Sequence, residues 1–172
     1  MTEKTENIKV SAEETGGVLY YLVGSKTDEF LNDKEALERT RLNKVDRDDL
    51  YIEMTILNMF IMINQYTHWE KDQKAYTKSL DKMHFLLFHQ LKEYSNYDQD
   101  DIEQLHHHIF RRYDEYGDAI EENFDASWLE VLAEVFLENL TAETEDKENS
   151  IKNLAKYIEK FYKTIPNILN TL

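Results

Sequence analysis

Apolar residues are concentrated in one stretch of this 172-residue chain, Leu50–Ile63. Eleven of its fourteen positions are apolar, and the exceptions are Glu53, Thr55 and Asn58. A helix that is apolar on every side must be enclosed by other helices or by lipid. The polar residues interrupt the run, and it is too short to cross ~30 Å of hydrocarbon. We therefore predict that a helix over about 49–69 forms the centre of a soluble helical bundle.

Four later segments repeat apolar residues every three or four positions, which is the period of an amphipathic helix. They cover about 72–94, 99–122, 127–140 and 150–165. The apolar stripe of the first segment consists of Tyr76, Leu80, Met83, Leu87, Leu91 and Tyr94, and it is widened by Phe85 and Phe88. We expect these segments to pack around the central helix.

Residues at the expected helix ends support these boundaries. Asp98 is the expected N-cap of the helix over 99–122. Ser127 and Glu130 have the spacing of a capping box, in which each side chain covers a free backbone amide. Pro166 is expected to kink or end the last helix, because proline lacks the amide hydrogen that a helix interior requires.

The N-terminal part is less regular. Residues 1–17 end in two glycines and predict a flexible arm. Residues 18–23 are apolar, and because the chain offers no partner strand we expect a short helix there. The polar segment 28–45 fits either a helix or a partly ordered connection. Together the segments predict an all-α, single-domain antiparallel bundle of about five main helices over 18–172.

Composition agrees with a helical protein. Four glycines and a single proline leave little material for hairpins and tight turns. The absence of cysteine excludes disulfides and thiolate metal sites. The first residues lack a basic start followed by an apolar segment, so they do not form a secretory signal. A cytoplasmic location, away from membranes, is therefore expected.

Acidic residues outnumber basic ones by 35 to 20, which gives a net charge of −15. A phosphate backbone would be repelled by this charge, so direct nucleic-acid binding is not expected. Thirteen acids and one lysine lie between Asp114 and Glu148, a charge of −12 for that part. This concentration predicts a docking face for a basic protein partner, or an imitation of a phosphate backbone, with a merely solvated surface as the alternative. The candidate partner-binding residues are Glu130, Glu134, Glu138, Glu143 and Glu145.

One pair of residues has the spacing of a metal site. Glu103 and His106 match the Glu-x-x-His motif of di-iron bundles, which places a carboxylate and an imidazole on one helical face. Such a site needs a second motif and two further glutamates, and the chain has no second Glu-x-x-His. Glu53 is the candidate for a further ligand. This set predicts a metal-dependent bundle enzyme as an alternative, and no other cofactor is expected.

Glu53 has a second interpretation, because a carboxylate among apolar side chains is costly unless it is paired. It would then reach an edge of the core or form an ion pair with Arg111 or Arg112. In this interpretation His106 borders the core, whereas His107 and His108 face water.

Three parts of the chain follow one another in a characteristic order: the apolar helix Tyr51–Ile63, then Leu80–His84 with Phe88-His89, then Arg111–Tyr116. This succession resembles a loose set of small all-α bacterial proteins with no assigned activity. A second set, Tyr113–Glu115, Leu132–Glu134 and Glu138–Leu140, is similar to the helical domain of ubiquinol–cytochrome c chaperones. The likeness spans about 49–163. It departs at Glu138, where that family usually has arginine, and it implies an assembly factor that binds a partner chain.

Taken together, the residues favour a non-enzymatic protein that binds a protein partner, as an interaction module, inhibitor or assembly factor. A metal-binding carboxylate–histidine enzyme is the first alternative. An inhibitor that imitates nucleic acid is the second, and it depends on the acidic region alone.

Overall fold

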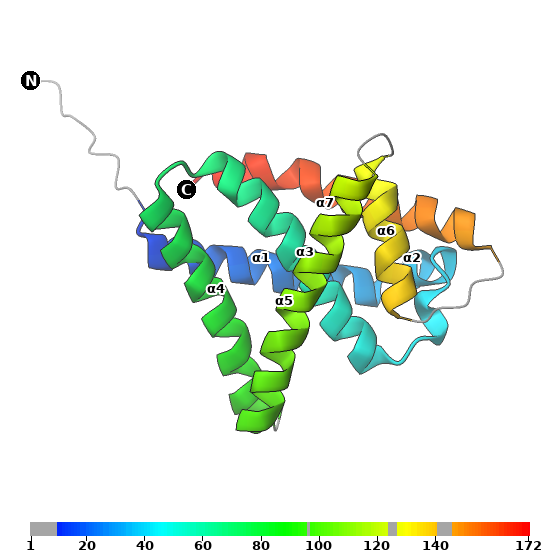
Figure 1. Cartoon of the computed structure of the whole chain (residues 1–172), viewed down its shortest axis with the longest axis horizontal. Coiled ribbons are helices and arrows are strands. Elements are labelled where there is room, and N and C mark those ends of the chain that lie inside the picture. Colours follow the sequence, from blue (N-terminus) through cyan, green and yellow to red (C-terminus); the bar gives the residue numbers. More distant parts are fainter. Residues whose placement is uncertain (1–9, 96, 124–126, 141–145) are drawn as a thin grey trace, which may run out of the picture.

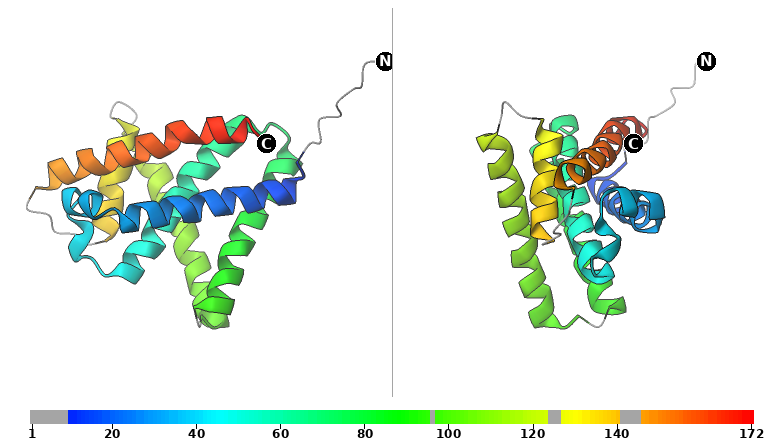
Figure 2. Two further views of the ribbon diagram at one scale, coloured as in Figure 1. Left: turned by 180° about the vertical axis from the view of Figure 1, so that it is seen from behind. Right: turned by 90° about the vertical axis from the view of Figure 1, so that its right-hand side faces the viewer.

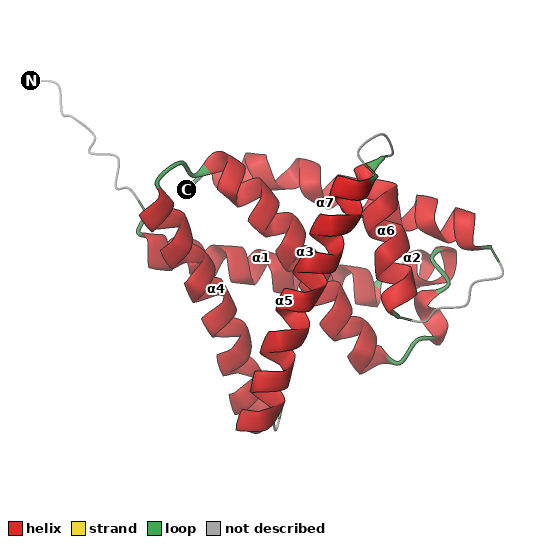
Figure 3. Ribbon diagram, in the orientation of Figure 1, coloured by secondary structure: helices red, strands yellow, loops and turns green. Residues whose placement is uncertain are grey.

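The computed structural model describes residues 10–95, 97–123, 127–140 and 146–172, and within these ranges the chain is helical without a strand. The elements are α1 (Ala12–Asn32), α2 (Lys34–Arg39), the short 3-10 helix η1 (Leu42–Lys44), α3 (Arg47–Trp69), α4 (Gln73–Tyr94), α5 (Gln99–Glu122), α6 (Trp128–Asn139) and α7 (Lys147–Leu169). Figures 1 and 3 show their arrangement. The predicted all-α helical bundle is confirmed. No helix in the described ranges combines the length and the apolar character needed to span a bilayer.

The central helix is α3, as predicted. It packs against α1, α4, α5, α6 and α7. Its apolar side chains on several sides are fully buried, among them Met54, Leu57, Met59 and Met62. Seen from the side, α5 and α6 lie on one side of α3, while α1 and α7 lie on the other (Figure 2). Because α3 has no polar face, other helices have to enclose it.

The N-terminal prediction needs correction, because α1 is a continuous helix of 21 residues rather than a short helix over 18–23. Ser11 caps it in a capping box: the Glu14 amide donates to Ser11 Oγ at 3.2 Å, and the Ser11 amide donates to Glu14 Oε2 at 2.9 Å. Residues 12–17 of the predicted arm thus belong to α1, and residues 1–9 lie outside the described ranges.

Gly16 marks a close helix crossing and not a flexible arm. A Cβ atom at Gly16 would lie 2.5 Å from the carbonyl oxygen of Ser79 in α4. The hydroxyl of Ser79 donates to the carbonyl oxygen of Ala12 at 2.8 Å and accepts from the hydroxyl of Tyr66 at 2.9 Å. Small residues at this crossing allow α1 and α4 to approach closely, and Tyr66 of α3 is hydrogen-bonded to Ser79 of α4 at the same point.

The polar segment 28–45 is helical for most of its length. It comprises the end of α1, then α2 and η1. Asp33 ends α1 and caps α2, because its carboxylate accepts from the Ala36 amide at 3.0 Å. Arg41 has a φ of 61° between α2 and η1, and this left-handed residue turns the chain towards α3.

Helices α4 and α5 form a V in Figure 1, joined at its tip and diverging towards the body of the molecule. The predicted N-cap of α5 is confirmed, since the Asp98 carboxylate accepts from the Asp101 amide at 2.9 Å. Phe60 of α3 contacts the V from behind, where its ring centroid lies 5.3 Å from that of Tyr116 in α5. The V is therefore held on the central helix.

The capping box predicted at Ser127 is wrong, and the last helix does not end at Pro166. Ser127 is the N-cap of α6, but its side chain makes no capping hydrogen bond, and instead its carbonyl oxygen accepts from the Glu130 amide at 2.9 Å. Pro166 lies inside α7, which continues to Leu169. Because proline has no amide hydrogen, the carbonyl of Tyr162 loses its helical donor, and Gln65 Nε2 reaches that oxygen at 3.5 Å. Burial of Ile165 and Leu169 favours continuation of the helix.

Candidate functional site

The only glutamate of α3 is buried and paired with α5. Glu53 is 6% exposed and Arg112 is 9% exposed. Arg112 Nη2 donates to Glu53 Oε1 at 2.9 Å, and its Nε donates to Oε2 at 3.0 Å. This two-point geometry is the strongest form of an arginine–carboxylate pair. The prediction that Glu53 pairs with a neighbouring arginine is confirmed, and the arginine is Arg112.

His108 joins this pair, although it was predicted to face water. Its Nε2 lies 2.7 Å from Glu53 Oε1, and its Nδ1 lies 2.9 Å from Arg111 Nη2. Since a guanidinium only donates hydrogen bonds, Nδ1 must accept, and Nε2 then carries the hydrogen that Glu53 accepts. The structure therefore contains a polar chain from buried Glu53 through neutral His108 to exposed Arg111.

The predicted metal set is not brought together. Glu103 is exposed and accepts from Gln99 Nε2 at 3.3 Å, while His106 is exposed rather than bordering the core, with its ring 4.8 Å from that of Phe110. Positions 106 and 108 differ by roughly 200° around a helix, so only one of them can face Glu53. Within the described ranges, no three histidine, aspartate or glutamate side chains are arranged to hold a metal ion.

A surface of aromatic and histidine side chains extends across α4 and α5, and we call it the aromatic–histidine surface. It consists of His84, Phe85, Phe88 and His89 of α4 and His106, Phe110 and Tyr113 of α5. The two helices touch through ring contacts: His84 stacks on Phe110 at 5.7 Å, and Phe88 lies 5.6 Å from His106. Three histidines and four phenylalanine or tyrosine side chains in contact across two helices are unusual for a solvated helix face.

The outer members of this surface are strongly exposed. Phe85 is 55% exposed and Phe110 is 44% exposed. Phe85 was predicted to widen the buried stripe of α4, and that prediction is wrong. Met83 is buried, and a residue two positions later points roughly 200° away from it, towards solvent. Tyr94 was also placed in the stripe, and it is 82% exposed at the end of α4.

His84 and Tyr113 form the base of the aromatic–histidine surface. His84 Nδ1 donates to the Leu80 carbonyl oxygen at 2.8 Å, and its Nε2 lies 3.1 Å from the Tyr113 hydroxyl. Burial lowers the pKa of His84, so the ring is neutral and Nε2 accepts from Tyr113. Burial also raises the pKa of the Tyr113 hydroxyl, which keeps its hydrogen for this bond. The bond connects α4 to α5 beneath the exposed rings.

A second face of α5 contains an open hollow of about 660 Å³. Its lining includes Tyr97, Asp101, His107, His108 and Arg111. His108 offers no free ring nitrogen to this hollow, because both nitrogens are already hydrogen-bonded. His108 therefore offers this hollow a polar contact but is not ready for proton transfer.

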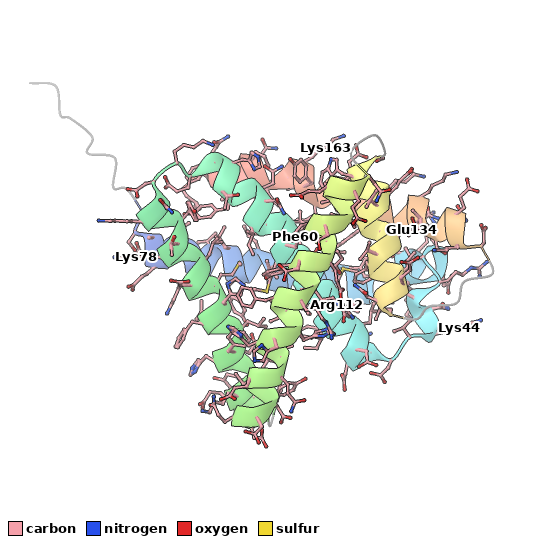
Figure 4. All side chains as sticks on the ribbon, in the orientation of Figure 1. Lys44, Phe60, Lys78, Arg112, Glu134 and Lys163 are labelled. Atoms are coloured by element: carbon pink, nitrogen blue, oxygen red, sulfur yellow. The ribbon has the colours of Figure 1, made fainter. Side chains whose placement is uncertain are left out.

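Three of the five candidate partner-binding glutamates lie on α6. Glu130, Glu134 and Glu138 follow one another at intervals of four residues and are exposed, and Figure 4 shows Glu134 on the outer side of α6. Lys147 Nζ lies 2.8 Å from a carboxylate oxygen of Glu134 and 2.8 Å from one of Glu138. Hydrogen bonds to these two carboxylates raise the pKa of Lys147 to about 12. The remaining candidates, Glu143 and Glu145, lie outside the described ranges.

Comparison with protein-family models, with curated proteins and with solved structures gives no match to this chain. The resemblance to small all-α bacterial proteins and to ubiquinol–cytochrome c chaperones therefore stays a prediction. The conclusion about function depends on the surfaces described above.

Proposed function

We propose that this protein is a non-enzymatic binding protein that docks a protein partner on the aromatic–histidine surface of α4 and α5. The observation that supports this function is the exposure of Phe85 and Phe110 within a cluster of ring contacts. Interface centres are enriched in aromatic residues and depleted of charged ones. Large exposed apolar patches with polar rims commonly mark protein-binding sites.

The surface is held rigid by polar contacts underneath it. The His84–Tyr113 hydrogen bond joins its two helices. The pair between Arg112 and Glu53 fastens α5 to the central helix, as the position of Arg112 in Figure 4 illustrates. A surface that is already ordered loses little conformational entropy on binding, which favours affinity.

The charge of the protein favours a basic partner. A net charge of −15 attracts cationic proteins and accelerates their encounter. The exposed stripe of Glu130, Glu134 and Glu138 adds a second contact for such a partner. Within the protein, Lys147 already pairs with two of these carboxylates. A lysine of the partner would make the same kind of contact.

The test begins with affinity purification from the native source, followed by isothermal titration of the purified partner. Replacing both Phe85 and Phe110 by alanine is expected to weaken binding at least tenfold, since central aromatic residues commonly dominate an interface. The matched control is Tyr94→Ala, which removes an exposed ring from the same helix outside the aromatic–histidine surface. It is expected to change affinity less than twofold.

Charge reversal of Glu130, Glu134 and Glu138 to lysine separates the two surfaces. If this triple variant loses binding while the double alanine variant keeps it, the partner docks on α6 and the assignment to α4 and α5 is wrong. If no protein binds the wild type saturably, the binding function itself is wrong.

A further inference from the structure

A separate hollow of about 320 Å³ lies between α1, α3 and α4. The parts of its lining that matter here are Tyr20, Tyr21, Gly24 and Asp28 of α1 and Tyr51 of α3. None of these residues belongs to the aromatic–histidine surface. The volume is at the lower end of the range for small-molecule sites, which runs from ~300 to ~1,000 Å³.

The spacing on α1 explains the shape of this hollow. Tyr20, Gly24 and Asp28 are four residues apart and therefore lie on one face of the helix. A Cβ atom added at Gly24 would meet no other atom within 4 Å. The missing side chain at Gly24 thus leaves open space between the tyrosine ring and the carboxylate, one helical turn from each.

Among the described residues, the lining contains three tyrosine rings and one carboxylate, and no lysine, arginine or histidine belongs to it. This part of the lining is therefore electrically negative. The faces of aromatic rings carry partial negative charge. Burial, and after it the charge of Asp28, raises the pKa of Tyr51. Both residues line this hollow. Burial raises the pKa of Tyr20 to about 12, so its hydroxyl stays neutral at physiological pH.

These features select one class of ligand. An anion would be repelled by Asp28, and a neutral apolar ligand would remove water from that carboxylate without replacing it. A cation on a small apolar body satisfies both the carboxylate and the rings, because aromatic faces attract ammonium groups. The net charge of −15 further raises the concentration of cations around the protein.

We propose that this hollow is a binding site for a small organic cation of the quaternary ammonium class, held by Tyr20, Tyr21 and Tyr51 and paired with Asp28. The site is independent of the proposed docking of a protein partner, because the two use different residues. Failure of one proposal therefore leaves the other unaffected.

Choline is the probe for this site, and binding is measured by NMR on protein with ¹³C-labelled tyrosine. Saturable shifts are expected in the ring signals of Tyr20, Tyr21 and Tyr51. The neutral analogue 3,3-dimethylbutan-1-ol has the same shape without the charge, and it is expected to bind at least tenfold more weakly. Asp28→Asn is expected to weaken choline binding at least tenfold as well.

A blocking variant provides the matched control. Gly24→Leu places a side chain in the open space and should abolish the shifts, while the loss of a helical glycine favours folding. Gly117→Leu makes the same exchange on α5, where a Cβ also meets no atom within 4 Å, and should leave binding unchanged. Equal binding of the neutral analogue, wild-type binding by Gly24→Leu, or the absence of saturable shifts in the wild type would each overturn the proposal.

Discussion

Replacing Glu53 by leucine is expected to destabilise the protein strongly through Arg112. The leucine fits the apolar surroundings, but it removes the carboxylate that accepts from Arg112 Nη2 and Nε and from His108. Breaking a buried ion pair from one side costs about 3–5 kcal/mol, because the remaining charge stays buried without a partner. Arg112 keeps one bond, from Nη1 to Glu115 at 2.6 Å.

Because that bond remains, the expected loss in the free energy of unfolding is at the lower end of this range, about 3 kcal/mol. For a domain of this size, each kcal/mol lowers the melting temperature by roughly 2–4 °C, so the expected decrease is roughly 6–12 °C. The free energy of unfolding is measured by urea denaturation and the melting temperature by calorimetry. Arg111→Met is the matched control, since Arg111 lies mostly in solvent on the same helix and should cost about 1 kcal/mol or less.

The double variant Glu53→Leu with Arg112→Met completes the cycle. Removing both charges leaves no buried ion without a partner, so its stability should return to within about 1.5 kcal/mol of the wild type. The reasoning is refuted if Glu53→Leu costs no more than Arg111→Met. It is equally refuted if the double variant is no more stable than the single one.

Three further predictions concern other contacts. Gly16→Ala should lower the free energy of unfolding, measured by urea denaturation, by about 1–3 kcal/mol, because its Cβ would overlap the backbone of α4. Gly17→Ala is the control: its Cβ would lie in open space, and it should stabilise α1 by about 0.5–1 kcal/mol. Burial keeps His84 neutral, so its pKa in the folded protein is below its pKa in the unfolded chain. The contribution of His84 to stability should therefore be full above pH ~6.5 and decline as the pH falls. His84→Gln should reduce that decline in denaturation curves recorded from pH 7 to 5. Lys147→Met breaks two exposed ion pairs and should change the free energy of unfolding by about 1 kcal/mol or less; a larger loss would show that the α6 stripe requires its internal lysine.

The pattern of apolar residues predicted most of the helices. The segment around Met54 and Leu57 has no polar face, and such a helix can only lie at the centre. The apolar repeat over 99–122 likewise predicted that one face of α5 is buried, and Leu105 and Ile109 lie on that face. These predictions succeed because the local spacing of apolar residues decides which face of a helix is buried, whichever element covers that face.

The same pattern misplaced residues whose surroundings depend on distant parts of the chain. Gly16 was interpreted as part of an arm, because only the approach of α4 shows why that position excludes a side chain. Pro166 was expected to disturb α7, but the side chain of Gln65 reaches the carbonyl oxygen that proline leaves unbonded. Neither neighbour is close in sequence.

The sequence by itself determined the all-α class, the central position of α3 and the need of Glu53 for a cationic partner. Only the tertiary structure decided that His108 rather than His106 faces Glu53, that Phe85 and Phe110 are exposed together, and that α1 leaves a tyrosine-lined hollow. The physical reason is the separation along the chain of the residues that each feature requires. Helical periodicity and the cost of a buried charge act on each residue wherever it lies, whereas a site requires side chains from separate helices at a distance that packing sets.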